Sequence, residues 1–310
     1  MQRSFLQDPL PVETLHQVRT WHGKLDAQAP GGDSVWAVVD GALLGTDGTR
    51  RLRAAYGTAV RAFDETPLAA YEELGLLLWQ WSTMDARDGL ESLRTVMDDR
   101  PGVSFVRIRA GRPDALGRIL AWLAGGTTAD GMPFYMRVGD SRVLSSFLRH
   151  MQPAQQAHLQ TVVREWVWPD RSGQAQSMVI QVGEPPLAEP AAALVIDDAQ
   201  YAALLDDAAA DILHAALRSI ESSWHDKRTG AQLHAWLQHV VQRADALGIT
   251  RQRDQLAFAS LALRVSGEFE TAPELGETWL RVRSGVATLP DEVEHWTPAQ
   301  WAAMERFWHV

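Results

Sequence analysis

The chain has 310 residues and no cysteine, which excludes disulfide bonds, thiol nucleophiles and cysteine metal sites. Hydrophobic residues make up 46% and charged residues 22%, as in an ordinary soluble globular protein, and the length allows two domains. The net charge of −10 is concentrated in residues 184–310, which contain 19 acidic and 10 basic side chains. This excess of acidic residues argues against nucleic acid as a partner. It suits either a basic protein partner or a role in solubility alone.

The first 22 residues mix charged side chains with two prolines and lack the apolar core of a signal peptide. No run of about 18 apolar residues occurs anywhere, so we expect no transmembrane helix and no membrane partner, and we expect a cytoplasmic protein. Residues 14–25 fit a short helix. Residues 34–39 form a continuous apolar run that stops at Asp40, which predicts a central strand buried on both faces.

The following stretch alternates between helical and strand signals. Residues 50–60 favour a helix, and residues 76–81 suit either a buried helix or a strand. A helix beginning at Asp85 precedes a strand at 103–109. In that strand Val106 and Ile108 alternate with Arg107 and Arg109, so one face is expected to meet water or an acidic surface. Both arginines are therefore candidate partner-binding residues.

The chain is organised around the stretch that begins at the Asp130–Gly131 turn signal. A short apolar run follows at 134–138. Arg137, Asp140 and Arg142 then lie close together where strand becomes helix, and Asp140 is placed to cap that helix. One carboxylate between two guanidinium groups predicts a charge-assisted clamp, which either only holds this corner or also contacts a partner.

Two β-prone runs at 162–168 and 177–182 flank a turn signal at 169–173, as in a hairpin. Trp166 and Trp168 lie on the first run and are candidate partner contacts, because tryptophan is enriched at interface hot spots. Strands and helices alternate up to this point. This pattern predicts an α/β N-terminal lobe, residues 1–183, with a mixed β-sheet flanked by helices.

A proline-rich segment at 184–196 is the best linker in the chain. Beyond it the pattern is entirely helical and acidic, which predicts an all-α C-terminal lobe at 197–310. The last helix carries Trp301, Met304 and Trp308 on one stripe. That stripe either packs in the core of the bundle or docks a partner helix.

No catalytic constellation appears in the sequence. There is no nucleophile elbow, phosphate-binding loop, dinucleotide fingerprint or zinc-protease motif. His234 and His239 are five residues apart, so on a helix they diverge too far to share one metal ion. We therefore expect no catalytic residues, no metal, no cofactor and no enzymatic activity.

The order of these motifs resembles a known family. The turn at Asp130–Gly131, the R-x-x-D-x-R-V-L pattern from Arg137, the amphipathic helix and the tryptophan-bearing strand are similar to the effector adaptor (chaperone) proteins of the bacterial type VI secretion system. These Tap/Tec-like adaptors share the domain of unknown function 4123. The run ending at Asp40 looks like the family's opening strand. The resemblance spans residues 34–168 and favours a strand at 76–80. The chain departs from the family pattern at Val138, where an aromatic residue is expected.

The resemblance implies a non-catalytic protein that binds a secreted effector and helps to load it onto the VgrG spike or its PAAR tip. The α/β lobe would hold the delivery segment of the effector, and Asp40 becomes a further candidate contact. The acidic helical lobe would add specificity or contact the spike. Two alternatives remain: a hydrolase whose histidines and aspartates meet only in the fold, and an immunity protein that neutralises a toxin.

Overall fold

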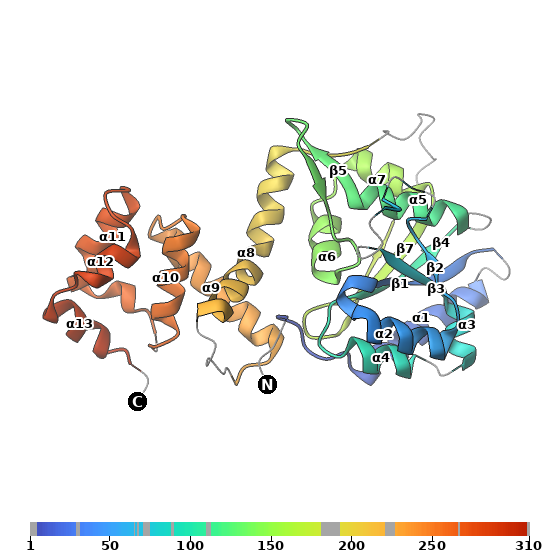
Figure 1. Ribbon diagram of the computed structural model, residues 1–310, viewed down its shortest axis with the longest axis horizontal. Coiled ribbons are helices and arrows are strands. Elements are labelled where there is room, and N and C mark those ends of the chain that lie inside the picture. Colours follow the sequence, from blue (N-terminus) through green and yellow to red (C-terminus); the bar gives the residue numbers. More distant parts are fainter. Residues whose placement is uncertain are drawn as a thin grey trace. The chain divides into compact units, whose positions relative to one another are not determined.

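The chain divides into two compact units in the computed structural model (Figure 1). The α/β unit comprises Arg3–Asp207 and the helical unit comprises Ala208–Val310. The described residues are 5–28, 32–64, 66, 68–70, 75–87, 90–109, 113–180, 193–220, 227–265 and 267–308.

The α/β unit is built on a six-stranded sheet in the order β2-β3-β1-β4-β7-β8, in which every neighbouring pair is antiparallel. The apolar run at 34–39 becomes its inner strand β1, which lies between β3 and β4. The bounds are β1 (Ser34–Asp40), β2 (Val60–Arg61), β3 (Leu76–Gln80), β4 (Val103–Ile108), β7 (Val163–Pro169) and β8 (Ala175–Val179).

Alternation along the strands gives this sheet two buried faces. Val38, Leu76 and Val106 point to one face, whereas Ala37 and Leu77 point to the other. The first face packs against α5 (Pro113–Ala124), α6 (Ser141–Arg149) and α7 (Pro153–Gln160). The second packs against α1 (Val12–Gln28), α2 (Gly41–Tyr56), α3 (Trp81–Arg87) and α4 (Glu91–Met97).

A second, three-stranded sheet has the order β6-β5-β9, in which β5 and β9 are parallel. Its strands are β5 (Gly125–Thr128), β6 (Pro133–Tyr135) and β9 (Leu194–Ile196). Gly126 is required here, because a Cβ atom would lie 2.6 Å from the ring of Phe134 and 2.7 Å from the carbonyl oxygen of Leu194. The predicted α/β lobe with helices around its sheet is confirmed, and the helical C-terminal region is confirmed with it.

The boundary between the units lies inside α8 (Asp198–Ile220). Of the predicted linker at 184–196, residues up to 192 lie outside the described residues, and Leu194–Ile196 forms β9 of the α/β unit. Gln155 and Gln200 exchange side-chain hydrogen bonds of 3.0 and 2.9 Å. Gln155 also donates to the carbonyl of Val195. These bonds fix the start of α8 on the α/β unit.

His158 on α7 offers a pH test of the core of the α/β unit. Burial lowers the pKa of its imidazole from 6.5, and its ring lies edge-on to Trp122 with the centroids 4.3 Å apart. Because the folded state resists protonation, the unfolded chain binds more protons below pH 6.5, and the free energy of unfolding should fall there. Comparing urea unfolding at pH 7.5 and 5.5 measures this fall. His158→Leu should reduce it, and an unchanged pH dependence in the variant would contradict the assignment.

The helical unit packs α9 (Gly230–Ala246), α10 (Gln252–Ala262), α11 (Gly276–Arg283), α12 (Leu289–Glu294) and α13 (Pro298–Glu305). Its core contains the rings of Phe258, Phe269 and Trp279, which contact one another with centroids 4.9–6.0 Å apart. Arg243 lies over both phenylalanine rings and forms a bidentate pair with Glu270. A guanidinium group is thus enclosed in an aromatic core.

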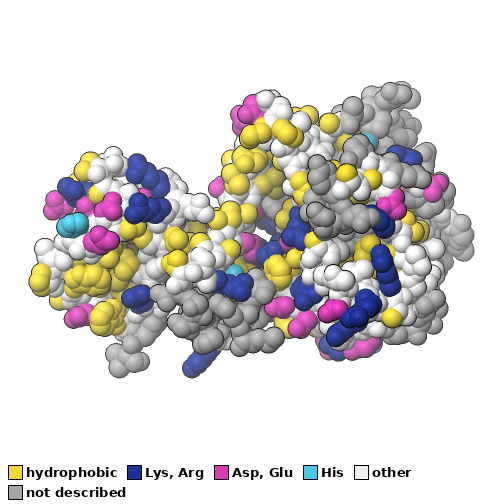
Figure 2. All heavy atoms as spheres, in the orientation of Figure 1, with side chains coloured by type: hydrophobic (Ala, Val, Ile, Leu, Met, Phe, Trp, Pro, Cys, Tyr) yellow, Lys and Arg dark blue, Asp and Glu magenta, His cyan; other side chains and the backbone are white. Residues whose placement is uncertain are grey.

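The predicted stripe on the last helix is only partly buried. Met304 is buried, but Trp301 is 38% exposed and Trp308 is 48% exposed. Figure 2 shows hydrophobic side chains gathered over α13. The core interpretation therefore holds for Met304 alone. No helix within the described ranges is both long and apolar enough to span a bilayer.

Candidate functional site

Asp40 joins the end of β1 to the start of α2 and anchors the candidate site. Its side chain is 2% exposed, and one carboxylate oxygen accepts a 2.9 Å bond from the backbone N–H of Leu43. The same carboxylate accepts two bonds from the Arg137 guanidinium, of 2.8 and 3.2 Å. Asp40 is therefore both a helix N-cap and half of a bidentate ion pair, which we call the Asp40–Arg137 joint.

The backbone beside the joint is closely packed. A Cβ atom on Gly139 would lie 2.8 Å from the Cβ atom of Asp40 and 2.5 Å from the Leu76 side chain. Burial raises the pKa of nearby Tyr135 to about 12, with a smaller contribution from the charge of Asp40. The hydrogen bond that Arg137 donates to Asp40 raises the pKa of Arg137. Both neighbours therefore keep their protons at neutral pH.

The predicted clamp of one carboxylate between two guanidinium groups is wrong. Asp140 bonds only Arg142 of the two arginines, through a bidentate pair of 3.0 and 2.6 Å, while Arg137 turns to Asp40. The predicted cap is confirmed, because the Asp140 carboxylate accepts a 3.0 Å bond from the backbone N–H of Arg142. The corner thus holds two separate ion pairs.

We expect Asp140→Ala to lower the free energy of unfolding by about 2 kcal/mol, since it uncaps α6 and leaves Arg142 without its carboxylate in a mostly buried site. Asp140→Asn should recover part of the loss, because asparagine also caps helices. Chemical denaturation measures both. Equal stability of Asp140→Ala and the parent protein would show that the pair contributes nothing.

Asp130 and Gly131 form the turn between β5 and β6, as the sequence predicts. Gly131 has a φ of +83°, which favours glycine. Hydrogen bonds from the Thr128 hydroxyl and then from the Met132 N–H lower the pKa of Asp130. The turn is fully explained by its own hydrogen bonds, and Asp130 is an exposed, ionised carboxylate.

The other predicted contact residues serve the interior. Trp166 and Trp168 are buried in the core, and the Trp166 indole donates a 3.0 Å bond to Ser104. Arg107 pairs with Asp33 at 2.9 Å, and Arg109 donates to the carbonyl of Gln160. The two tryptophans are therefore not partner contacts, and both arginines are engaged inside the chain.

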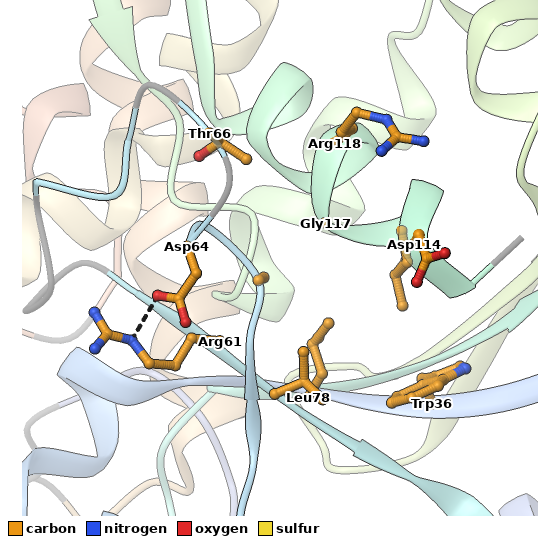
Figure 3. Close-up of a pocket in the computed structure, with 11 residues that line it drawn as sticks. Trp36, Arg61, Asp64, Thr66, Leu78, Asp114, Gly117 and Arg118 are labelled. Carbon is orange, nitrogen blue, oxygen red and sulfur yellow. Dashed lines mark ion pairs between the residues drawn. The ribbon is translucent and has the colours of Figure 1, made fainter.

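A hollow of about 300 Å³ lies beside edge strand β2 (Figure 3). Trp36 and Leu78 give it an apolar side, and α5 contributes Asp114 near its N-terminus. Arg61 pairs with Asp64 at 3.0 Å on the opposite side. The volume is at the small end for ligand pockets, so the hollow suits a single side chain better than a large substrate.

A larger groove of about 750 Å³ lies along α2, beside the start of β3. Arg50, Arg53 and Arg61 line it, and Figure 2 shows Lys and Arg side chains over α2. Arg50 pairs with Asp47, and both side chains are well exposed. The groove carries more positive than negative charge, so it favours acidic groups.

The fold brings together one serine, one aspartate and one histidine that the sequence analysis did not connect. Asp207 accepts a 2.6 Å bond from the Ser146 hydroxyl and lies 3.0 Å from the Nε2 atom of His150. Arg149 pairs with the same carboxylate at 3.3 Å. In a nucleophilic triad the serine bonds the histidine, whereas here both bond the aspartate. The cluster therefore fastens α8 to α6 and does not activate the serine.

No group of three or more histidine, aspartate or glutamate side chains in the described part of the chain could hold a metal ion. The sequence analysis missed two contacts between distant residues: Asp40 with Arg137, 97 residues apart, and Asp207 with α6, about 60 residues apart. An aspartate directly after a buried strand was the available signal for the first. No local pattern marked the second.

Comparison with known proteins gives one match. No curated protein and no solved structure matches the chain. Residues 35–158, less than half of the chain, match the family model described as "Domain of unknown function (DUF4123)", and this region contains the Asp40–Arg137 joint.

Proposed function

We propose that this protein is a non-catalytic adaptor of a type VI secretion system, which binds a secreted effector in the cytoplasm and helps to load it onto the VgrG spike or its PAAR tip. The observation that carries the proposal is the match of residues 35–158 to DUF4123, the domain that the resembled adaptors share. The match begins in β1 and ends in α7, so it covers the strands and helices that build the joint.

The geometry of the α/β unit supports a binding role more than a chemical one. Its most buried charges, Asp40 and Asp140, are each satisfied by an arginine and a helix N-terminus. His150 and Ser146 both bond Asp207, and these bonds hold α6 and α8 together. These ion pairs and caps tie the strands and helices of the unit together, and a binding surface that is already ordered avoids the cost of ordering loops when a partner binds.

The partner surfaces follow from charge and exposed apolar area. The groove along α2 is lined by three arginines, of which Arg50 and Arg61 also pair with aspartates, and it offers an acidic segment more positive than negative charge. Trp301 on α13 and Trp308 just after it are exposed. Tryptophan is a frequent interface anchor, and charge selects between partners. We assign the effector segment to the α/β unit and the spike to the helical unit.

Co-expression tests the proposal. The tagged protein is purified together with the effector and the VgrG protein encoded in the same secretion cluster, and complex formation is measured by size-exclusion chromatography. The expected result is a stable complex with the effector. A folded protein that binds neither would exclude the adaptor function.

Two further assays separate the alternatives. An immunity protein would protect cells from the toxin when expressed alone, whereas an adaptor would not. A hydrolase would lose turnover in Ser146→Ala or His150→Ala, whereas an adaptor has no turnover to lose.

A further inference from the structure

We propose that two copies of this protein pair through strand β8, joining their six-stranded sheets edge to edge. β8 ends the sheet opposite β2, so its outer side has no neighbouring strand among the described residues. The two edges differ in length, since β2 has two residues and β8 has five. A very short edge strand gives little backbone for another chain to pair with, so it protects the edge. β8 is long enough to pair.

The hydrogen bonds to β7 show which backbone groups of β8 point outward. Ile180 donates to Arg164 at 2.9 Å, and Asp170 donates to Gln174 at 2.8 Å. Because such bonds recur at every second residue, Gln176 and Met178 also bond β7. The N–H and C=O groups of Ala175, Ser177 and Val179 therefore face away from the sheet. No hydrogen bond described for this chain uses them.

Three of the usual protections of an exposed edge are absent from β8: charged residues, proline and a bulge. Residues 174–180 read Q-A-Q-S-M-V-I and contain neither a charged residue nor a proline. The register with β7 runs without a bulge from Val179 to Ala175. Helix α1 contacts β8, but Ser177 remains exposed and Val179 is 62% exposed. Val179 is the most exposed of the large hydrophobic side chains described in the α/β unit.

The strand is complementary to itself, which identifies a second copy as the occupant. In an antiparallel pair centred on Ser177, Ser177 faces Ser177 of the copy, and Val179 faces Ala175. The three outward residues of each strand then exchange backbone hydrogen bonds reciprocally. No like charges meet, because the strand has none. Val179 would be covered by Ala175 of the copy. Ala175 lies at the border of the hydrophobic core, because its side chain packs against that core.

The first test measures mass against concentration. Light scattering should show the mass rising from 34.4 kDa toward twice that value as the protein is concentrated to roughly 1 mM, the weak end of specific binding. Ser177→Lys places two lysines opposite each other and should remain monomeric. Val60→Lys adds the same charge to the other edge, at a valine that is 54% exposed, and should dimerise like the parent protein.

The second test fixes the register, using the absence of native cysteines. Ser177→Cys should form an intermolecular disulfide readily, because facing hydrogen-bonded residues have Cα atoms about 5.5 Å apart, within the range for such bonds. In Gln174→Cys, also exposed, the two thiols would be roughly 20 Å apart and should not react. A parent protein that stays monomeric at the highest concentration would overturn the proposal. Equal crosslinking of the two cysteine variants would overturn it too.

Discussion

Replacement of Asp40 by alanine should destabilise the α/β unit by about 3 kcal/mol. The change removes the N-cap of α2, a contribution of about 1 kcal/mol, and breaks a pair whose carboxylate is buried. Breaking a fully buried pair costs about 3–5 kcal/mol. The Arg137 side chain is 39% exposed and can regain water, so only part of that cost applies. Denaturant unfolding followed by circular dichroism measures the loss.

Two control variants separate the loss of the helix cap from the loss of the buried ion pair. Asp40→Asn keeps a capping oxygen but removes the charge, so it should lose less than the alanine variant. Asp47→Ala breaks the exposed Arg50 pair on the same helix and should change stability by less than about 0.5 kcal/mol. If the two alanine variants were equally stable, the joint would be no stronger than a surface ion pair.

Replacement of Arg243 by alanine should destabilise the helical unit by about 4 kcal/mol. Arg243 and Glu270 are both mostly buried, and removing one partner leaves the other charge uncompensated. The guanidinium also packs over Phe258 and Phe269, and that contact is lost with it. Arg243→Met restores packing volume but not charge, so it should remain clearly destabilised.

The matched control in the same unit is Arg306→Ala. Arg306 pairs with Glu274 at 2.9 Å, but both side chains are exposed, so the loss should be below about 1 kcal/mol. Hydrogen exchange locates the effect, since the Arg243 variant should accelerate exchange in α9 and α10. Slow exchange there in the Arg243 variant would place the pair outside the stabilising core.

The sequence predicts those elements whose pattern is local. The apolar run ending at Asp40 becomes β1, and Asp140 caps α6. The strands β5 and β9 are missed because they are short, and β5 begins with two glycines that fit a helix stop equally well. Their partners lie far along the chain, with Thr127 opposite Val195. β5 has no buried-strand pattern of its own, and the apolar residues of β9 directly follow the proline-rich stretch that the sequence analysis assigns to a linker.

The candidate site shows the same limit. Arg137 has Asp140 three residues away and Asp40 97 residues away, and it bonds the distant one. Sequence proximity favours the wrong partner here because the β1–α2 junction lies beside the start of α6 only in the folded chain. Trp166 and Trp168 likewise look like interface anchors by residue type. Their positions in a sheet covered on both faces make them core residues.

The place of β9 decides where a minimal fragment can end. Leu194 and Ile196 fill the core on one face of the large sheet, alongside residues of α5 and α6 that precede them by more than 40 positions. A recombinant piece that stops at residue 183 would lack both side chains and expose the apolar surface they cover. One that runs through Asp207 keeps the interior whole, so the autonomous domain is longer than the segment recognised as DUF4123.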